Sequence, residues 1–465
     1  MMSLMEAVVA TGGTALHGNP RIEGVSTDTR TIASGELFVA LKGENFDGHE
    51  FVGAAAERGA AAAMVDQSWA EGRESSLPLL AVADTRLALG ALGAWWRARF
   101  EIPLVGITGS NGKTTVKEMT AAILRAQARA DGYDPALAVL ATAGNLNNDI
   151  GLPQMLLRLH ASHRAAAIEM GMNHPGEIAY LTRLAQPTVA LVNNAQRAHL
   201  AGLGGVAEVA CAKGEIFDGL RAGGTAVINA DDPFCDLWRG MNAGRRMLTF
   251  GLAQPADVRG RAEPKGLGSL LAMETPQGAL EVALAVPGVH NARNALAATA
   301  AALAAGATLA AVSAGLTSFA GVKGRLQVRQ AAGGALLIDD SYNANPDSVR
   351  AAIDVLAATP GRKILVLGDM GEIGGQAGQF HDEIGGYAKS QGVDLLLALG
   401  EHSELAARNF GAGGRHFDSA DALLAALAPQ LEGDTVVLVK GSRFMRMERV
   451  ADLLAQDSQA GNGLH

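Results

Sequence analysis

Seven consecutive residues carry the strongest chemical signal in the sequence. They are Gly109, Ser110, Asn111, Gly112, Lys113, Thr114 and Thr115. An apolar run at 104–108 precedes them and a stretch with helical spacing follows, so a buried strand is predicted to turn here into a helix. In such a turn, backbone N–H groups and the helix N-terminus attract phosphate. We expect Lys113 to reach the terminal phosphates of a nucleotide and Thr114 to hold Mg²⁺.

The glycine spacing departs from the usual phosphate-binding loop. Ile107 takes the place of the first glycine, and the glycines fall at positions 106, 109 and 112. The segment is therefore a shortened Gly-x-x-Gly-Lys-Thr form. A strand–helix turn that binds no ligand is the alternative.

A carboxylate stands near the end of another apolar run. Residues 165–170 are predicted to form a strand, and Glu169 is its one charged residue. Because the carboxyl ends of parallel strands meet at one edge of a sheet, Glu169 is expected beside the phosphate loop as a second Mg²⁺ ligand. A surface glutamate is the alternative. His199 in a loop and Lys213 in a helical stretch follow, and each taken alone is typical of a surface residue.

Other polar clusters suit substrates. The first hundred residues contain Ser26, Thr27, Asp28, Arg30, Lys42 and Asn45. These types fit a diphosphate and a sugar, and solvated hairpin loops are an equally good interpretation. Asn145 and Asn148 present amides that suit a sugar amide or a peptide, although amides also favour turns.

Two clusters follow predicted strands near the C-terminus. Asp340 could accept ribose hydroxyls, and Asn345, directly before a proline, is predicted to cap a helix. Lys440 and Arg443 place two cations on one loop, which suits a carboxylate or a phosphate.

Strand–helix alternation must position these groups. Residues 101–320 predict a mostly parallel sheet, with strand pairs over 257–286 and a polar surface excursion over 125–137. From residue 321 the alternation restarts as a doubly wound unit. We therefore expect an α/β chain of three domains: a small mixed α/β domain at 1–100 for substrate, a central P-loop ATPase domain with a parallel sheet at 101–320, and a Rossmann-like domain at 321–465.

Composition limits the function classes. Hydrophobic residues make up 48% of the 465 residues, which is enough for several hydrophobic cores. The chain has only two cysteines, which fits a protein of the reducing cytoplasm. The net charge of −9 argues against general nucleic-acid binding. No long uncharged apolar run predicts a membrane span, and the N-terminus is a poor signal peptide.

Taken together, the motifs resemble the Mur ligase family, ATP-dependent amide-forming enzymes of peptidoglycan synthesis. The resemblance extends over nearly the whole chain. Its strongest motifs are 106–119, 143–151 and 169–178, supported by 198–200, 212–217, 290–295, 339–346, 368–370 and 440–443. Within the family, the sequence is most similar to the type that joins D-alanyl-D-alanine to UDP-N-acetylmuramoyl-tripeptide, giving ADP and phosphate.

The resemblance also implies roles for single residues. Lys213 would be carbamylated and would hold two Mg²⁺ ions together with Thr114, Glu169 and His199. Asn294 and His290 would lie near the adenine of ATP, Asp340 would bind the ribose, and Arg325 would approach the phosphates from the third domain. The substrates would be contacted by Ser26 to Arg30, Lys42, Asn45, Asn145, Asn148, Tyr342, Asn343 and Lys440. Cys211 replaces a second lysine that relatives often carry, which singles out Lys213.

Three alternatives stay open. The nearest is a Mur ligase that adds a single amino acid. The second is a folylpolyglutamate synthetase, in which residues 1–100 would have no role. The third is a regulatory module that would bind a nucleotide without catalysing a reaction. The expected enzyme is a cytoplasmic monomer that phosphorylates the tripeptide carboxylate. The amine of D-alanyl-D-alanine would then attack the acyl phosphate.

Overall fold

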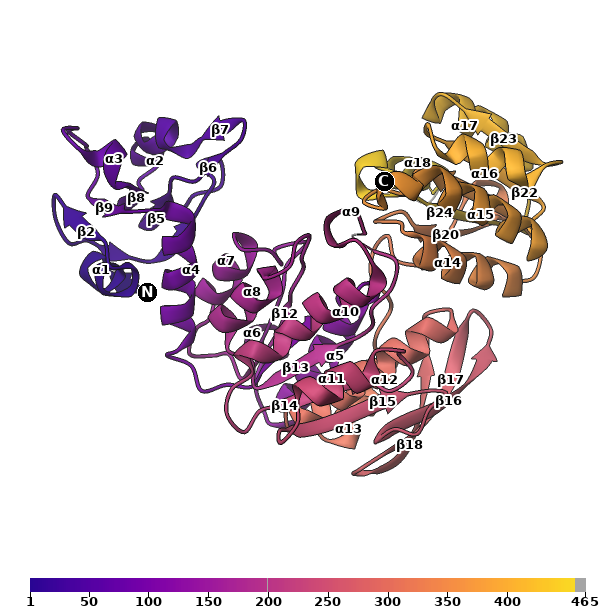
Figure 1. Cartoon of the computed structure of the whole chain (residues 1–465), viewed down its shortest axis with the longest axis horizontal. Coiled ribbons are helices and arrows are strands. Elements are labelled where there is room, and N and C mark those ends of the chain that lie inside the picture. Colours follow the sequence, from indigo (N-terminus) through magenta and orange to yellow (C-terminus); the bar gives the residue numbers. More distant parts are fainter. Residues whose placement is uncertain (199, 456–465) are drawn as a thin grey trace, which may run out of the picture.

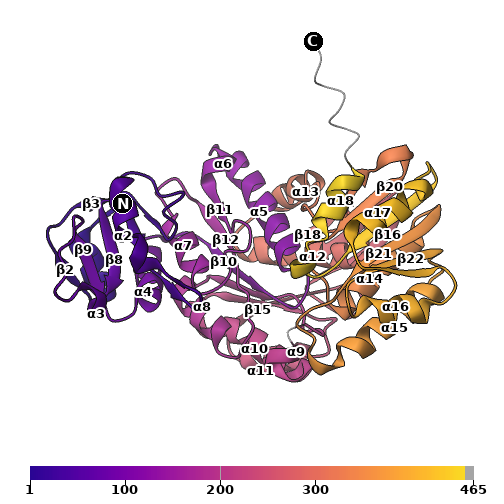
Figure 2. The ribbon, with the colours of Figure 1, turned by 90° about the horizontal axis from the view of Figure 1, so that it is seen from above.

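The structure, a computed structural model, describes residues 1–198 and 200–455. Three large sheets follow one another along the chain, and the parts that hold the first and the third lie at opposite ends of the central part (Figure 1). Seen from above, the three parts form a row (Figure 2). None of the helices in the described ranges combines the length and the apolarity needed to cross a bilayer.

The N-terminal part is built on a five-stranded sheet. Its strand order is β2 (Thr14–Leu16), β9 (Leu79–Val82), β8 (Ala62–Asp66), β5 (Glu36–Val39) and β4 (Gly24–Ser26). Only the β2–β9 pair in this sheet is antiparallel. Two short pairs join β1 (Met2–Ser3) to β3 (Arg21–Ile22) and β6 (Lys42–Gly43) to β7 (Phe46–Asp47). The helices are α1 (Leu4–Thr11), α2 (Val52–Glu57), α3 (Gln67–Ala70) and α4 (Thr85–Arg97).

The central sheet has nine strands. Their order is β11 (Val139–Ala141), β12 (Ala165–Glu169), β10 (Leu104–Thr108), β13 (Val189–Val192), β14 (Thr225–Asn229), β15 (Arg246–Gly251), β16 (Val258–Lys265), β17 (Gly268–Thr275) and β18 (Gly278–Leu284). All pairs are parallel up to β15–β16, and the last two are antiparallel. The expected parallel sheet and the strand pairs over 257–286 are therefore confirmed.

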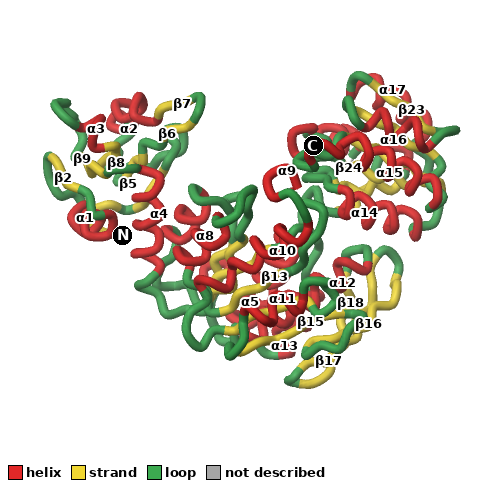
Figure 3. Tube along the Cα trace, viewed as in Figure 1, coloured by secondary structure: helices red, strands yellow, loops and turns green. Residues whose placement is uncertain are grey.

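Helices cover both faces of this sheet (Figure 3). The helices of the central part are α5 (Lys113–Ala130), α6 (Pro135–Ala138), α7 (Gly151–Leu157), α8 (Glu177–Ala185), α9 (Leu200–Leu203), α10 (Val206–Gly214), α11 (Cys235–Met241), α12 (Val289–Ala304) and α13 (Leu309–Thr317), and α9 projects toward the C-terminal part. Along β10, Val105 and Ile107 pack against α5 and α12, while Leu104 belongs to the core on the other face with α8 and α10. Burial on both faces explains why the central strands are apolar without alternation.

The C-terminal part holds a six-stranded sheet. Its order is β19 (Gln327–Gln330), β20 (Leu336–Asp340), β24 (Thr435–Lys440), β21 (Arg362–Gly368), β22 (Leu395–Leu399) and β23 (Gly414–Phe417), and only the β19–β20 pair is antiparallel. The helices are α14 (Pro346–Ala358), α15 (Ala377–Ser390), α16 (Ser403–Phe410), α17 (Ala420–Leu427) and α18 (Glu448–Leu454). Cores on both faces of the sheet confirm the doubly wound arrangement.

One sequence expectation fails locally. The polar stretch 125–137 is not wholly an excursion, because α5 continues to Ala130 before the chain turns. Ala128 is buried against the sheet, so a narrow apolar stripe is enough to extend this helix although its other faces are charged.

Candidate active site

The phosphate loop joins β10 to α5, as its sequence predicts. Gly112 has φ +80°, a left-handed conformation that favours glycine, and α5 begins directly after it. The ammonium of Lys113 donates to the carbonyl oxygens of Gly109 at 2.8 Å and Ser110 at 3.2 Å, so it lies over its own loop. Burial lowers the pKa of Lys113, and the nearby Glu169 carboxylate opposes this shift.

Glu169 lies beside this loop, at the carboxyl end of β12. Its carboxylate accepts from the hydroxyl of Thr114 at 2.9 Å and from the amide of Asn147 at 2.8 Å, and only 3% of the residue is exposed. The sheet therefore brings Thr114 and Glu169 together. Three oxygen-bearing side chains meet at one strand end, and oxygen is the ligand atom that Mg²⁺ prefers.

Lys213 is fully buried on α10. Its Nζ atom has no hydrogen-bond partner among the described residues. Desolvation lowers the pKa of Lys213 well below its usual range, Lys113 lowers it further, and Glu169 opposes the shift. Burial thus favours the uncharged form of this amine, which is the nucleophilic form, over the charged form that a surface lysine has.

His199 lies outside the described residues. Within the part of the chain that the structure describes, no three His, Cys, Asp or Glu side chains gather as a possible metal site.

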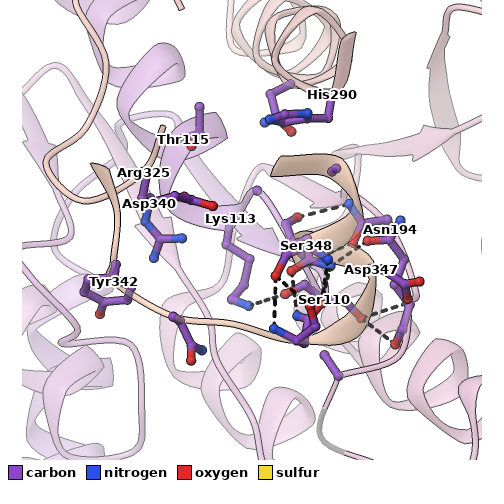
Figure 4. Close-up of a pocket in the computed structure, with 18 of the residues that line it drawn as sticks. Ser110, Lys113, Thr115, Asn194, His290, Arg325, Asp340, Tyr342, Asp347 and Ser348 are labelled. Carbon is purple, nitrogen blue, oxygen red and sulfur yellow. Dashed lines mark hydrogen bonds between the residues drawn. The ribbon is translucent and has the colours of Figure 1, made fainter. Parts of the chain in front are cut away.

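A wall from the C-terminal part faces the phosphate loop (Figure 4). Asp340 accepts from the ammonium of Lys440 and from the backbone N–H of Leu326. The guanidinium of Arg325 lies 4.3 Å from the centre of the Tyr342 ring. Lys440 also donates to the carbonyl oxygen of Asn343 at 3.0 Å. This wall therefore carries two cations, of which Lys440 is paired with Asp340.

The amide side chains of the central part line the opposite wall. Asn294 accepts from Asn193 at 3.0 Å, and both side chains lie close to Gly112. His290 is half-buried, and desolvation together with Lys440 and Arg293 lowers its pKa to about 4, which keeps it neutral at pH 7. Neutral polar groups of this kind suit a base or a sugar rather than a phosphate.

These walls enclose a cavity of about 1350 Å³. The residues expected from the sequence that line it are Ser110, Asn111, Gly112, Lys113, Thr115, Asn145, Asn148, Glu169, His290, Asn294, Arg325, Asp340, Tyr342, Asn343 and Lys440. Gly109, Thr114 and Lys213 are not on its surface, although the first two contact residues that are. The volume is large enough for more than one substrate.

The N-terminal cluster lies apart from this cavity. Ser26, Thr27, Asp28, Arg30, Lys42 and Asn45 are absent from its lining. Asp28 instead pairs with Arg30 at 2.7 Å, and hydrogen bonds from that side chain and its backbone lower the pKa of Asp28 to about 2. Arg86 and Leu87 on α4 are the side chains of residues 1–100 that do reach the cavity.

Comparisons with known proteins agree along the chain. Three family models match consecutive segments: the Mur ligase family catalytic domain at 21–95, the Mur ligase middle domain at 107–302 and the Mur ligase glutamate ligase domain at 324–443. A curated protein of Escherichia coli K12, UDP-N-acetylmuramoyl-tripeptide--D-alanyl-D-alanine ligase, is 44% identical over 94% of each chain. The chain belongs to the Mur ligase family.

Solved structures of Mur ligases agree with the fold. The structure of MurF from Acinetobacter baumannii has a TM-score of 0.89 at 36% identity and covers 97% of this chain and 98% of its own. That of the MurF ligase of Thermotoga maritima in complex with ADP has a TM-score of 0.80 at 27% identity, covering 94% and 98%. The similarity to these structures therefore supports the α/β class, and the ADP complex supports the use of ATP by this Mur ligase.

The structure also shows contacts that single motifs did not indicate. The phosphate-loop residue Asn111 donates to Gln196 at 2.6 Å and exchanges hydrogen bonds with Asn345 at 2.8 and 3.3 Å. Arg197 pairs with Asp347 at 2.6 Å, one residue into α14 from its proline. The one sequence signal for these contacts was the predicted Asn345 cap. That cap is confirmed by a 2.9 Å bond from the backbone N–H of Ser348.

Proposed function

We propose that this Mur ligase joins D-alanyl-D-alanine to UDP-N-acetylmuramoyl-tripeptide and converts ATP to ADP and phosphate. The reaction belongs to the synthesis of a peptidoglycan precursor. The observation that carries the proposal is the 44% identity to the Escherichia coli ligase of that name over 94% of both chains. The cavity between the phosphate loop and the C-terminal wall supports it, because it is large enough for a nucleotide and a peptide.

The chemistry follows from the weakness of a carboxylate as an acyl donor. The tripeptide carboxylate attacks the γ-phosphate of ATP, ADP leaves, and an acyl phosphate results. The amine of D-alanyl-D-alanine then attacks the acyl carbon, phosphate leaves, and the amine loses a proton. Lys113 and Arg325 balance the charge that develops on the transferred phosphoryl group. The reaction requires no protein nucleophile, but water must be kept from the acyl phosphate.

The residues at the Glu169 end of the cavity fit Mg²⁺. Thr114 and Glu169 offer hard oxygen donors, and the unpartnered Lys213 amine suits carbamylation. In that modification the neutral amine adds to CO₂ and loses a proton, which gives a carbamate oxygen as a further ligand. Thr114, Glu169, His199 and carbamylated Lys213 would hold two Mg²⁺ ions, which neutralise phosphate charge when bound.

The remaining contacts divide the cavity between the ligands. We assign Asn294 and His290 to the adenine, Asp340 to the ribose, and Gly109 to Thr115 to the phosphates. Asn145 and Asn148 face the muramoyl peptide, and Tyr342, Asn343 and Lys440 lie on the D-alanyl-D-alanine side. The UDP moiety extends to the N-terminal cluster of Ser26, Thr27, Asp28, Arg30, Lys42 and Asn45. We also propose three domains divided near residues 100 and 320, and a monomer that works in the cytoplasm.

Product mass tests the proposal. The purified chain is incubated with UDP-N-acetylmuramoyl-tripeptide, D-alanyl-D-alanine and Mg-ATP, and mass spectrometry should detect the dipeptide adduct with one ADP per product. Single amino acids replace D-alanyl-D-alanine in a parallel reaction. ADP release with a single amino acid but not with the dipeptide would overturn the assignment. Lys113→Ala should abolish ADP formation.

A further inference from the structure

Lys117 is a buried cation that the mechanism above does not use. It lies one turn beyond Lys113 on α5 and is only 1% exposed. Its ammonium donates to the carbonyl oxygen of Thr142 at 2.8 Å and to the carboxylate of Glu118. Burying an ammonium is costly unless hydrogen bonds compensate it, so the stability of this buried lysine depends on its bonds to Thr142 and Glu118.

Thr142 connects this lysine to the metal end of the site. Its hydroxyl accepts the backbone N–H of Glu169 at 2.9 Å, and its own N–H donates to the carbonyl oxygen of Ala167 at 3.1 Å. The residue is 2% exposed. Thr142 therefore continues the pairing of β11 with β12 and holds the backbone N–H of Glu169, whose carboxylate contacts the phosphate loop.

The segment 143–149, which follows Thr142, also contacts the Glu169 carboxylate. It carries Asn145 and Asn148 on the cavity surface. Between them, Asn147 donates to Glu169 at 2.8 Å, and its carbonyl oxygen accepts the N–H of Gly171 at 2.8 Å. Thr114 also donates to Glu169 at 2.9 Å. The hydrogen bonds thus run from Lys117 through Thr142 and Glu169 to Thr114, and we call this series, which begins and ends on α5, the circuit.

We propose that Lys117 and Thr142 are positioning residues that hold the Glu169 carboxylate and the 143–149 segment as one unit. The proposal rests on the proposed function, because it assigns Glu169 to Mg²⁺ and the segment to the muramoyl peptide. A displacement of Thr142 moves both groups. The two residues therefore link the affinity for the metal to the affinity for the UDP-linked peptide, while they touch neither ligand.

Substitutions of Thr142 and Lys117 test the circuit. Thr142→Val removes the acceptor at nearly constant volume, and Thr142→Ser keeps it. Lys117→Met removes the donor. The matched control is Thr120→Val on the same helix, because the Thr120 hydroxyl is buried and has no partner in the described part of the chain.

Three measurements separate positioning from stability. Mn²⁺ binding in the presence of ADP is followed by electron paramagnetic resonance. The KM values for the UDP-linked tripeptide and for D-alanyl-D-alanine come from initial rates, and thermal unfolding reports stability. Loss of an outer-shell partner typically weakens metal binding about 10- to 100-fold. We expect losses in that range for Thr142→Val and Lys117→Met, with a raised KM for the UDP-linked tripeptide and an unchanged KM for D-alanyl-D-alanine. Thr142→Ser should restore most of the affinity.

Other results would refute positioning. Thr142→Val with unchanged Mn²⁺ affinity and unchanged KM values would overturn it, even if the melting temperature falls. An equal loss in Thr120→Val would also overturn it, because burial alone would then explain the effect. If Lys117→Met does not fold, the comparison of Thr142→Val with Thr142→Ser still decides. Ligation by the wild-type chain is measured in the same series, so failure of the proposed function is visible separately.

Discussion

Gly112→Ala perturbs the phosphate loop at one atom, and its effect can be calculated from the structure. The backbone at Gly112 has φ +80°, a conformation that costs an L-residue about 1–2 kcal/mol. The new Cβ would also lie 2.5 Å from the Asn294 carbonyl oxygen and 2.6 Å from the Asn193 amide nitrogen. Both amides must move, which breaks their mutual 3.0 Å hydrogen bond. A buried polar group left unpaired costs roughly 1–3 kcal/mol more.

Gly132→Ala is the matched control. Gly132 follows the other end of α5 with φ +82°, and an added Cβ there meets no atom within 4 Å. This variant therefore has the backbone strain without the collision. Because nucleotide binding is expected to need the undisplaced loop and Asn294, restoring that geometry costs the energy of the collision on binding, which corresponds to an affinity loss of roughly tenfold to a hundredfold.

Calorimetric titration with ADP and the KM for ATP provide the assay, with thermal unfolding alongside. We expect Gly112→Ala to bind ADP at least tenfold more weakly than both the wild-type chain and Gly132→Ala. Equal ADP affinity in the two variants would refute the reasoning. In that case Asn193 and Asn294 adjust to the extra carbon without disturbing the site.

Three further predictions concern other parts of the molecule. Lys213→Ala should lose ligase activity, and formate or acetate should restore part of it; full activity without an additive would exclude the carbamate. Burial and His160 lower the pKa of His163 to about 4, so its contribution to stability is lost as pH falls from about 6.5 to 4. His163→Gln should remove at most about 2 kcal/mol of that pH dependence between pH 7 and pH 5, measured by urea unfolding at the two pH values. Arg197→Ala and Asp347→Ala should couple by about 1 kcal/mol in kcat/KM for D-alanyl-D-alanine, and additive effects would argue against their contact in the active form.

The site was most predictable where its geometry is local. The strand–turn–helix around Lys113 and the Asn345 cap depend on neighbouring residues, and both are confirmed. Glu169 beside Thr114 was predictable because parallel strands end at one edge. The short edge strands β19 and β23 were missed, since their residues are mostly polar and half-buried and do not give the apolar signal of the inner strands.

Contacts between distant segments were beyond the reach of the sequence. Asn111 and Asn345 are separated by 234 positions, and their amides gave no indication that they pair. The position of Thr142 between Lys117 and Glu169 likewise depends on how β11 and β12 lie side by side. A threonine before a glycine-containing turn predicts only a turn. Assigning such partners requires the three-dimensional arrangement.

The Asn111–Asn345 pair bears on how the two halves of the site cooperate. Asn345 caps α14 while it bonds to the phosphate loop, so the N-termini of α5 and α14 both face one cavity. Each N-terminus favours an anion, and their fields add where the nucleotide phosphates are expected. Because α14 belongs to the C-terminal part, ATP binding should be strongest in the orientation in which these two helices converge. We therefore expect the charge of the nucleotide to stabilise the arrangement in which Arg325 and Lys440 face the phosphate loop.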